Sequence, residues 1–428
     1  MSNLIYNRIL FVLMFTSLVF TRIPPLNFPI QISKISIFLL FILIVLRNAF
    51  QKNNNINGEI KITLIYFFIR SFSVINTVEI VPFVLSFQTF ITGYLGFFIG
   101  LMLCNEKYRN KIINIYFFAF ILSTCINIGL ELLFLSGNNA YLPFIKENFA
   151  QLIQANIERG RPYISFFNEL SVPILLYWII QKRNYAPIYP NLRKAFPYIL
   201  LVTLIILALL SNWRIRIVLY IFCFFSLFLL IKKIDIGKTI RVFLFIFIIG
   251  VSVFILYPYA SNIQYVSGRF FSDINIPEAI SDPTNLLTSR SVLIKKALDV
   301  GLAYPITGVG FDNFYNFFHK SRAIAIHNDS LSNEVFHSPH NLLLTNFVES
   351  GFPGLILISL LLFIYMSDDY KSLKNFKEYD LKVVLIVQFW GIVIYSMVHP
   401  TDSKEFLYLF FFIRGLLASY KLSYEKTK

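Results

Sequence analysis

Twelve apolar runs, separated by polar segments, follow one another along this sequence. They occupy residues 9–22, 33–46, 62–77, 84–104, 112–135, 168–181, 197–211, 215–231, 242–258, 341–366, 383–399 and 405–420. A helix needs about 20 apolar residues to cross a bilayer, and fewer where its ends are amphipathic. The pattern therefore predicts an all-α integral membrane protein with about twelve transmembrane helices.

The composition agrees with a membrane protein and argues against other classes. Hydrophobic residues make up 57% of the 428 positions, charged residues make up only 14%, and the mean hydropathy is +0.66. A soluble domain carries about a quarter charged residues. The net charge of +15 is spread between the apolar runs, so we expect no nucleic-acid partner. The three cysteines lie inside apolar stretches without metal-ligand spacing, which favours packing roles.

The basic residues predict how the chain is oriented. Lys and Arg are concentrated in alternate segments between the runs, and such segments stay cytoplasmic. This places both termini in the cytoplasm and two long loops, 137–167 and 259–340, on the opposite face. The organisation is then nine helices in 1–258, a large extracytoplasmic loop in 259–340 and three helices in 341–428. All five histidines fall on the extracytoplasmic side: His319, His327, His337, His340 and His399.

The large loop contains its own predicted elements. The segment 285–301, "NLLTSRSVLIKKALDVG", is typical of an amphipathic helix that ends at Gly301. The following Gly308-x-Gly310 pair has neither a preceding strand nor a third glycine at the dinucleotide-binding spacing. It predicts a glycine-rich turn before a short aromatic helix.

Five arginines on the extracytoplasmic side are candidate ligands for an anion: Arg159, Arg161, Arg214, Arg216 and Arg290. Each could instead extend its side chain to lipid headgroups. Positive charge is disfavoured on this face, however, and a planar guanidinium can grip a diphosphate through two parallel hydrogen bonds. The arginines therefore suggest a diphosphate-binding surface.

The stretch "FHSPHNLLLTNFVESGFPGL", residues 336–355, places a polar cluster at the start of the tenth run. Asn341 is suited to cap a helix that begins at Leu342. His340 would lie at the positive end of the helix dipole, which favours a neutral imidazole able to act as a general base. It could instead serve only as a cap or a hydrogen-bonding loop residue. His337 is expected to be mainly a positioning residue.

Glu349 lies eight residues inside the same run, where an unpaired carboxylate would be costly. We expect a buried structural pair with Arg414, which has a similar predicted depth, with Arg70 as an alternative partner. A direct acid/base role for Glu349 is the second interpretation. The sequence has no Walker loop, HExxH motif, GxSxG elbow or paired acidic motif on the outer face. Its chemistry would therefore use Arg and His, without a metal or another cofactor.

The segments "RSVLIKKALDVGLAYPITGVGFDNF" and "HSPHNLLLTNFVESGFPGLILISLLLF" resemble the O-antigen ligase/polymerase superfamily. The family pattern pairs an arginine-led helix and a G-x-G turn with H-N followed by E-x-G-x-x-G. "RPYISFFNELS" and "LLSNWRIRIVLY" are similar to two further arginine-containing family segments. Together with the twelve runs and the large loop, the resemblance covers most of the chain.

This resemblance implies a GT-C-like membrane glycosyltransferase acting on the outer face of the bacterial inner membrane. Its donor would be a glycan on undecaprenyl diphosphate, and its acceptor a second glycan or lipid A-core. Arg161 and Arg214 would bind the diphosphate, Arg290 would assist and His340 would be the base; Arg216 remains an alternative to Arg214. A chain-length regulator protein is an implied partner.

Three functions fit the sequence to different degrees. Polymerisation of repeat units into O-antigen or capsular polysaccharide is our first choice, and transfer of the finished glycan by a ligase is the second. A lipid-linked oligosaccharide flippase is the non-enzymatic alternative. A transporter would be expected to place charges along several spans and to show similar halves, whereas these polar residues gather on one face.

The predicted orientation can be tested by thiol labelling. In a variant without the three native cysteines, a cysteine introduced near Asn328 should react with a membrane-impermeant thiol reagent in intact spheroplasts. A cysteine introduced near Lys374 should react only after permeabilisation, because its segment is expected to be cytoplasmic. The reverse labelling pattern would overturn the assignment of every site residue to the outer face.

Overall fold

The computed structural model describes most of the predicted helices. The described residues are 3–22, 32–48, 58–73, 80–103, 109–135, 168–181, 190–210, 214–230, 289–311, 313–314, 317, 339, 341–374, 381–397 and 404–426. Within them every regular element is a helix, which confirms the all-α prediction for this part of the chain. The ninth apolar run, 242–258, lies outside the described residues.

The remaining apolar runs coincide with helices. Their bounds are α1 Asn3–Arg22, α2 Ile32–Asn48, α3 Gly58–Ser71, α4 Ile80–Leu103, α5 Arg109–Leu135, α7 Val172–Gln181, α8 Pro190–Leu210, α9 Arg214–Leu230, α15 Leu342–Lys374, α16 Leu381–Ser396 and α17 Lys404–Lys426. A short 3₁₀ helix, η3 (Asn168–Ser171), precedes α7, and α13 (Ser289–Ala303) lies within the predicted loop. By length and composition, two described helical segments could cross a membrane, Ile112–Leu133 and Leu342–Leu373. The number of crossings stays a prediction.

One predicted helix boundary is wrong. Helix α13 does not end at Gly301 but continues to Ala303. Gly301 is not among the described glycines with positive φ, so it does not act as a left-handed helix cap. Its small size serves packing instead, because a Cβ atom there would lie 2.3 Å from Cε1 of the Phe347 ring.

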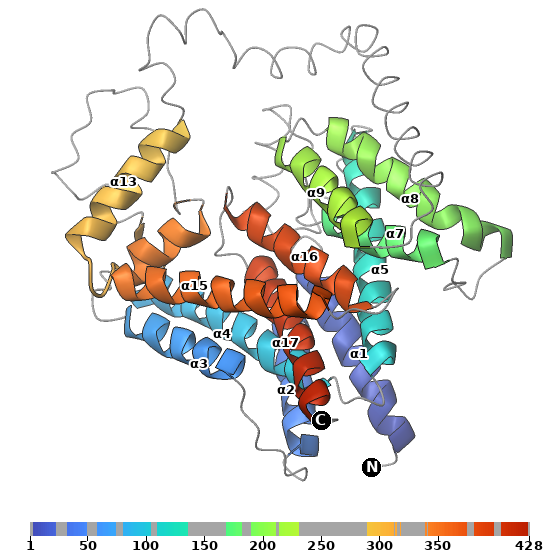
Figure 1. The fold of residues 1–428 in the computed structure, drawn as a ribbon, viewed down its shortest axis with the longest axis horizontal. Coiled ribbons are helices and arrows are strands. Elements are labelled where there is room, and N and C mark those ends of the chain that lie inside the picture. Colours follow the sequence, from blue (N-terminus) through green and yellow to red (C-terminus); the bar gives the residue numbers. More distant parts are fainter. Residues whose placement is uncertain are drawn as a thin grey trace, which may run out of the picture.

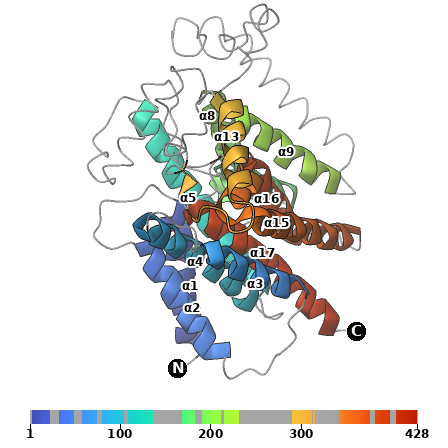
Figure 2. The same ribbon diagram turned by 90° about the vertical axis from the view of Figure 1, so that its left-hand side faces the viewer.

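Helix α15 crosses the middle of the molecule, as Figures 1 and 2 show. Helices α3 and α4 lie below it in Figure 1, α13 lies above its first residues, and α7, α8 and α9 form a group on the other side. The first residues of α1 and the last of α17 lie toward the same end of the molecule in both views. This arrangement is compatible with the predicted even number of crossings.

Helices α4 and α17 pack unusually closely because glycines line their crossing. A Cβ atom at Gly100 would lie 2.4 Å from the Phe412 carbonyl oxygen, and one at Gly415 would lie 2.1 Å from that of Phe97. Gly96 and Gly100 form a G-x-x-x-G pair, the spacing that lets membrane helices approach backbone to backbone. Since lipid is as apolar as a side chain, close van der Waals packing replaces the hydrophobic effect as the driving force.

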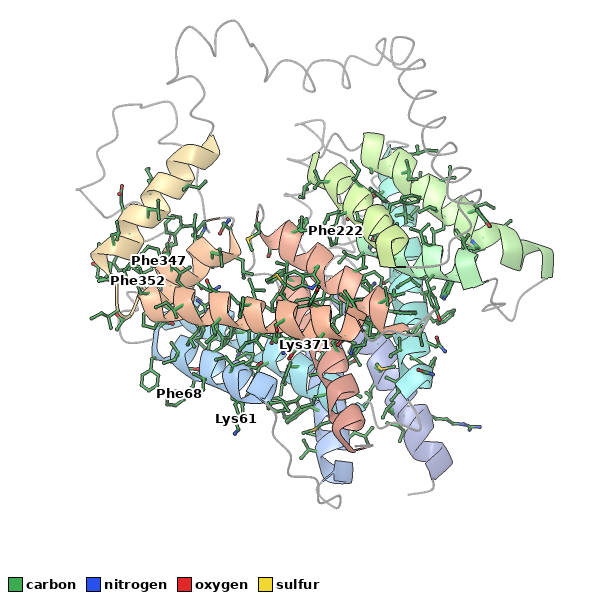
Figure 3. The ribbon with its side chains drawn as sticks, in the orientation of Figure 1. Lys61, Phe68, Phe222, Phe347, Phe352 and Lys371 are labelled. Carbon is green, nitrogen blue, oxygen red and sulfur yellow. The ribbon has the colours of Figure 1, made fainter. Side chains whose placement is uncertain are left out.

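The distribution of side chains differs from that of a soluble protein in its buried charges and its exposed apolar residues. Arg70, Arg216 and Arg414 are buried, whereas Phe68, Phe363 and other large apolar side chains are exposed on the outside of the helices. Figure 3 shows Phe68 on α3 directed away from the bundle. Charges sequestered inside and hydrocarbon outside are what a lipid environment requires. The described surface therefore agrees with a membrane setting.

The α4–α17 crossing generates a stability prediction. Gly100→Ala and Gly415→Ala should each lower the free energy of unfolding by about 1–3 kcal/mol, because the added methyl group meets backbone atoms that cannot move aside. The matched control is Gly129→Ala in α5, where a Cβ atom has nothing within 4 Å. Thermal unfolding in detergent, followed by size-exclusion chromatography, measures the difference. Equal effects at all three positions would contradict the close crossing.

Candidate functional site

The described part of the candidate site is built around a break in α15. Gly351 has φ 66° and ψ −163°, a conformation outside the helical region that favours glycine. Pro353 follows two residues later and lacks the N–H that a continuous helix would use. The break divides α15 into a short segment, 342–350, and a long segment, 352–374, and it frees backbone groups that need other partners.

The Gly308–Gly310 turn supplies those partners. The N–H groups of Val309 and Gly310 donate to the carbonyl oxygens of Val348 and Glu349, at 2.9 and 3.1 Å. On the other side of the break, the N–H of Phe352 donates to the carbonyl oxygen of Pro305 at 2.7 Å. The predicted glycine-rich turn is confirmed, since both glycines of the pair have positive φ.

Steric contacts explain why these positions are glycines. A Cβ atom at Gly308 would lie 2.3 Å from the backbone carbon of Glu349, and one at Gly351 would lie 2.4 Å from the carbonyl oxygen of Pro305. Side chains would therefore separate the turn from the helix break. The two glycine motifs of the sequence form one interlocked junction.

The short segment of α15 also packs against α13. Ala297, Val300, Val309, Phe314 and Val348 form a small apolar core that is separate from the main core. On α13, burial lowers the pKa of the Lys296 ammonium below its usual value. The loop helix and the start of α15 thus share a core, which holds them as one body.

Asn341 caps α15 as predicted. Its side-chain oxygen accepts hydrogen bonds from the N–H groups of Leu343 and Leu344, at 3.0 and 3.1 Å. Its amide nitrogen donates to the carbonyl oxygen of Met397, at 2.9 Å. Asn341 therefore fixes the beginning of α15 to the end of α16, directly after His340 in the sequence.

Glu349 forms its ion pair with Arg70 of α3. The Arg70 Nη2 atom lies 2.6 Å from the Glu349 Oε2 atom, and Arg70 Nη1 donates to Ser350 Oγ at 3.1 Å. The guanidinium carbon of Arg70 also lies 4.1 Å from the ring centre of Phe311, beside the glycine turn. One arginine thus links α3 to both sides of the junction.

The expected pair of Glu349 with Arg414 is wrong. Arg414 binds Asp369 near the other end of α15, with Nη1 at 2.8 and 2.9 Å from the two carboxylate oxygens. Trp390 donates to the same carboxylate at 2.9 Å. The prediction compared only how many residues separate each charge from the end of its helix. Which charges pair depends also on the tilt of the helices and on which of their faces meet.

Arg216 lies in a second buried polar cluster. Its Nε atom donates to Glu169 Oε1, and its Nη2 atom lies 3.7 Å from Glu131 Oε2. Each of the three side chains is only 1% exposed. The cluster joins α9 to η3 and α5, and it occupies Arg216 with protein carboxylates. Two residues earlier, Arg214 begins α9.

The remaining predicted site residues are not brought together in the described part of the chain. Arg290 lies in the first turn of α13. Four others lie outside the described residues: Arg159, Arg161, His337 and His340. Among the described residues no group of three or more His, Cys, Asp or Glu could hold a metal ion.

Sequence reasoning did not single out Glu131, Glu169 or Asp369, although a signal was present. Each is an acidic residue next to or within an apolar run, at "LELLF", "FNELS" and "MSDDY". Every buried arginine in such a protein requires a compensating acidic partner. Matching acidic residues to arginines across all runs would have pointed to these three.

A comparison with protein families finds a match that includes this junction. Residues 199–359 match the family model described as O-antigen ligase. No curated protein matches the chain. The matched segment contains α9, α13, the glycine turn and the break in α15. The helices of the described part, their apolar outer surface and this match are together consistent with a membrane protein.

The match confirms the resemblance to the O-antigen ligase/polymerase superfamily. It suggests an O-antigen ligase/polymerase-type function for the chain.

The revised ion pairs can be tested by removing charges singly and in pairs. Glu349→Leu should cost about 3–5 kcal/mol of stability, because it leaves the Arg70 guanidinium buried without its carboxylate. Adding Arg70→Leu should restore much of the loss, whereas adding Arg414→Leu should not. Arg414→Leu should be rescued by Asp369→Leu instead. Thermal stability and membrane levels of the five variants measure this pattern, and rescue of Glu349→Leu by Arg414→Leu would contradict it.

Proposed function

We propose that this protein polymerises oligosaccharide repeat units carried on undecaprenyl diphosphate, on the outer face of the inner membrane. The observation that carries the proposal is the O-antigen ligase family match over 199–359, because it spans the interlocked junction of α13, the glycine turn and α15. The donor glycan would enter where the predicted outer loop meets the start of α15.

The reaction requires two tasks of the protein. A hydroxyl oxygen of the acceptor glycan attacks the anomeric carbon of the donor, and the bond from that carbon to the diphosphate oxygen breaks. A base removes the hydroxyl proton as the new glycosidic bond forms. Positive groups neutralise the charge that develops on the diphosphate leaving group. Arginine and histidine side chains suffice for these tasks, so the proposal includes no metal or cofactor.

We assign the base role to His340 and a positioning role to His337. The capped start of α15 supports this assignment, since Asn341, the residue after His340, is itself fixed by three hydrogen bonds of its side chain. A catalytic group must be held in place by neighbours that are themselves fixed. Glu349 is paired with Arg70 and 3% exposed, which supports a structural role rather than acid/base chemistry.

We assign diphosphate binding to Arg161 and Arg214, with Arg290 and Arg159 as helpers. Arg216 is the less suitable of the α9 pair, because its guanidinium is buried against Glu169 and Glu131. Releasing it to bind a ligand would leave two buried carboxylates uncompensated. In this proposal Arg216 anchors α9, and the anchor sets the position of Arg214.

The ligase reaction is the second candidate, and the description of the matched family favours it. The two reactions share the donor and the proposed site, and they differ in the acceptor. A ligase transfers the finished glycan to lipid A-core, whereas a polymerase transfers it to another repeat unit. Analysis of glycan chain lengths in a deletion strain can separate the two reactions.

Glycan ladders of a deletion strain test the proposal. If the protein is a polymerase, the strain should retain single repeat units on the cell-surface acceptor and lose all longer chains. Loss of every attached glycan, with long chains still on the lipid carrier, would identify a ligase. Accumulation of single lipid-linked units on the cytoplasmic leaflet would identify a transporter and contradict glycosyl transfer.

Complementation of the same strain tests the residue roles. His340→Ala should lose about 10²–10⁴-fold in transfer rate, the usual effect of removing a general base. Arg214→Lys keeps the charge but loses the two-pronged geometry, so it should also fail to restore the ladder. The matched control is Arg8→Lys, an exposed position on α1, which should restore it. Full activity of His340→Ala at equal membrane levels would overturn the base assignment.

A further inference from the structure

Helix α13 carries an exposed apolar stripe, although it belongs to the predicted outer loop. Ile294, Leu298 and Leu302 recur every four residues and therefore share one side of the helix. Their side chains are 44%, 42% and 60% exposed, and that of Ile306, just beyond the helix, is 75% exposed. Large apolar side chains that gather on one side, rather than lying scattered, mark an interaction surface.

The other two sides of α13 have different surroundings. Ala297 and Val300 are buried in the small core that the helix shares with α15. Asp299 lies three residues after Lys296 and four before Ala303, so these three share another side, on which Asp299 and Ala303 are exposed. The helix thus has a side facing protein, an exposed side with charged residues and an exposed apolar side.

The apolar stripe is continuous with the outer surface of α15. The Phe352 N–H donates to the Pro305 carbonyl oxygen at 2.7 Å, and a Cβ atom at Gly351 would lie 2.8 Å from the backbone carbon of Ile306. Figure 3 shows Phe352 at the end of α15 beside α13. From there an exposed apolar row follows a helix that is long and apolar enough to cross a membrane; its members are Phe352, Ile356, Leu360 and Phe363. The stripe on α13 therefore begins where this row begins.

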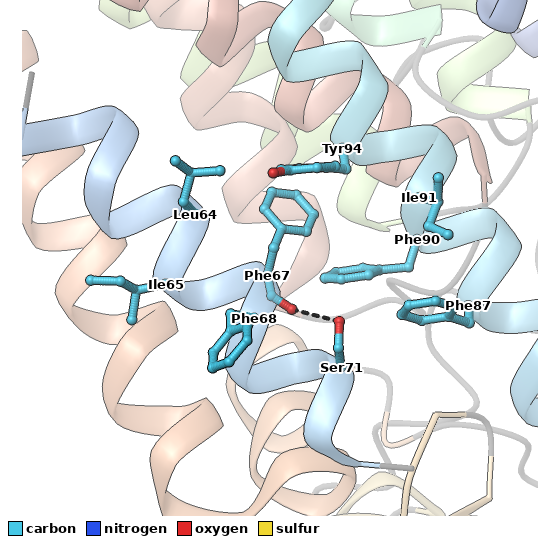
Figure 4. A pocket seen from close by; sticks show the side chains of 9 residues that line it. All are labelled: Leu64, Ile65, Phe67, Phe68, Ser71, Phe87, Phe90, Ile91 and Tyr94. Carbon is cyan, nitrogen blue, oxygen red and sulfur yellow. Dashed lines mark hydrogen bonds between the residues drawn. The ribbon is translucent and has the colours of Figure 1, made fainter. Parts of the chain in front are cut away.

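A second uncharged surface reaches the same place from α3 and α4. An open groove lies between these helices (Figure 4), and none of the residues that line it is charged. The Ser71 hydroxyl in the groove already donates to the Phe67 carbonyl oxygen, at 2.9 Å. The ring centre of Phe90, also in the groove, lies 4.8 Å from that of Phe311, which follows the glycine turn. Surfaces suited to lipid thus flank the junction on both sides.

We propose that α13 lies in the headgroup region of the bilayer, with its Ile294–Leu298–Leu302 stripe toward the acyl chains and Asp299 toward water. Interfacial helices bury an apolar side about 5–10 Å into this region and keep a charged side in water. The occupant of the stripe is lipid, because a soluble partner following it onto α15 would have to enter the membrane. The predicted outer loop therefore returns to the membrane surface at α13, and the shared core ties the start of α15 to that depth. This inference rests on the membrane setting and not on glycosyl transfer.

Nitroxide accessibility in the full-length protein tests the proposal. Single cysteines are introduced into a cysteine-free parent, spin-labelled and placed in nanodiscs of phosphatidylethanolamine and phosphatidylglycerol. Oxygen concentrates in lipid, whereas a soluble nickel chelate stays in water. The ratio of oxygen to nickel accessibility should be several-fold higher for Leu298→Cys and Leu302→Cys than for Asp299→Cys and Ala303→Cys. Ile356→Cys, on the exposed row of α15, is the matched lipid control, and the two stripe variants should approach its value.

Two results at the stripe would overturn the proposal. High nickel accessibility at Leu298→Cys and Leu302→Cys would place the stripe in water. Low accessibility to both reagents would show that protein covers it, either another part of this chain or a second copy. Each substituted side chain is exposed, so we expect the variants to fold like the parent, and size-exclusion chromatography checks this.

A nickel chelate attached to a lipid headgroup tests the depth of the helix. It should relax labels at Leu298→Cys and Leu302→Cys several-fold more strongly than a label at Phe363→Cys. Phe363 follows Phe352 by eleven residues, about 16 Å along α15, so it lies deeper in the bilayer if α13 is at the surface. Relaxation at Phe363→Cys equal to that at the stripe would contradict the headgroup position of α13. None of these measurements depends on enzyme activity, so the inference can fail while the proposed function stands, and the reverse.

Discussion

A helix that breaks within a membrane must find new partners for the backbone groups it releases, since lipid offers no hydrogen bonds. In this protein the break at Gly351 depends on the Gly308–Gly310 turn, whose N–H groups bind the carbonyl oxygens of Val348 and Glu349. The turn comes from a loop between predicted spans, so the loop cannot be moved without exposing the break. Much of the described site follows from this single constraint.

Buried charge provides the second level of organisation. Arg70, Arg216 and Arg414 each bind an acidic residue from a distant segment, and each pair ties helices that are far apart in sequence. Leaving one charge of such a pair uncompensated costs far more than the pair itself contributes. The pairs therefore restrict how the helices can be arranged, and Arg70 does so at the junction itself, where it touches Glu349, Ser350 and Phe311.

Much of the helical architecture could be predicted because lipid imposes a simple rule on sequence. Long apolar runs mark helices, and the structure places helices on all the predicted runs within its described part. Local signals were also sufficient for the Asn341 cap and the turn at Gly308, because a cap and a positive-φ turn depend on a few neighbouring residues. The histidine and arginine candidates came from residue type and predicted side alone, and His340 and Arg161 lie outside the described residues.

The partner of Glu349 shows where such reasoning stops. Counting residues from the helix mouth gave Arg414 a suitable depth, but α15 crosses the molecule at a steep angle to α17 (Figures 1 and 2), and Asp369 meets Arg414 instead. By itself the sequence determined which segments are helical, where α15 begins and which residues need buried partners, since these depend on local composition and spacing. Only the tertiary structure decided which charges pair, that the glycine turn fills the break in α15 and that α3 and α4 enclose an aromatic groove, because each requires the relative tilt and rotation of helices distant in sequence.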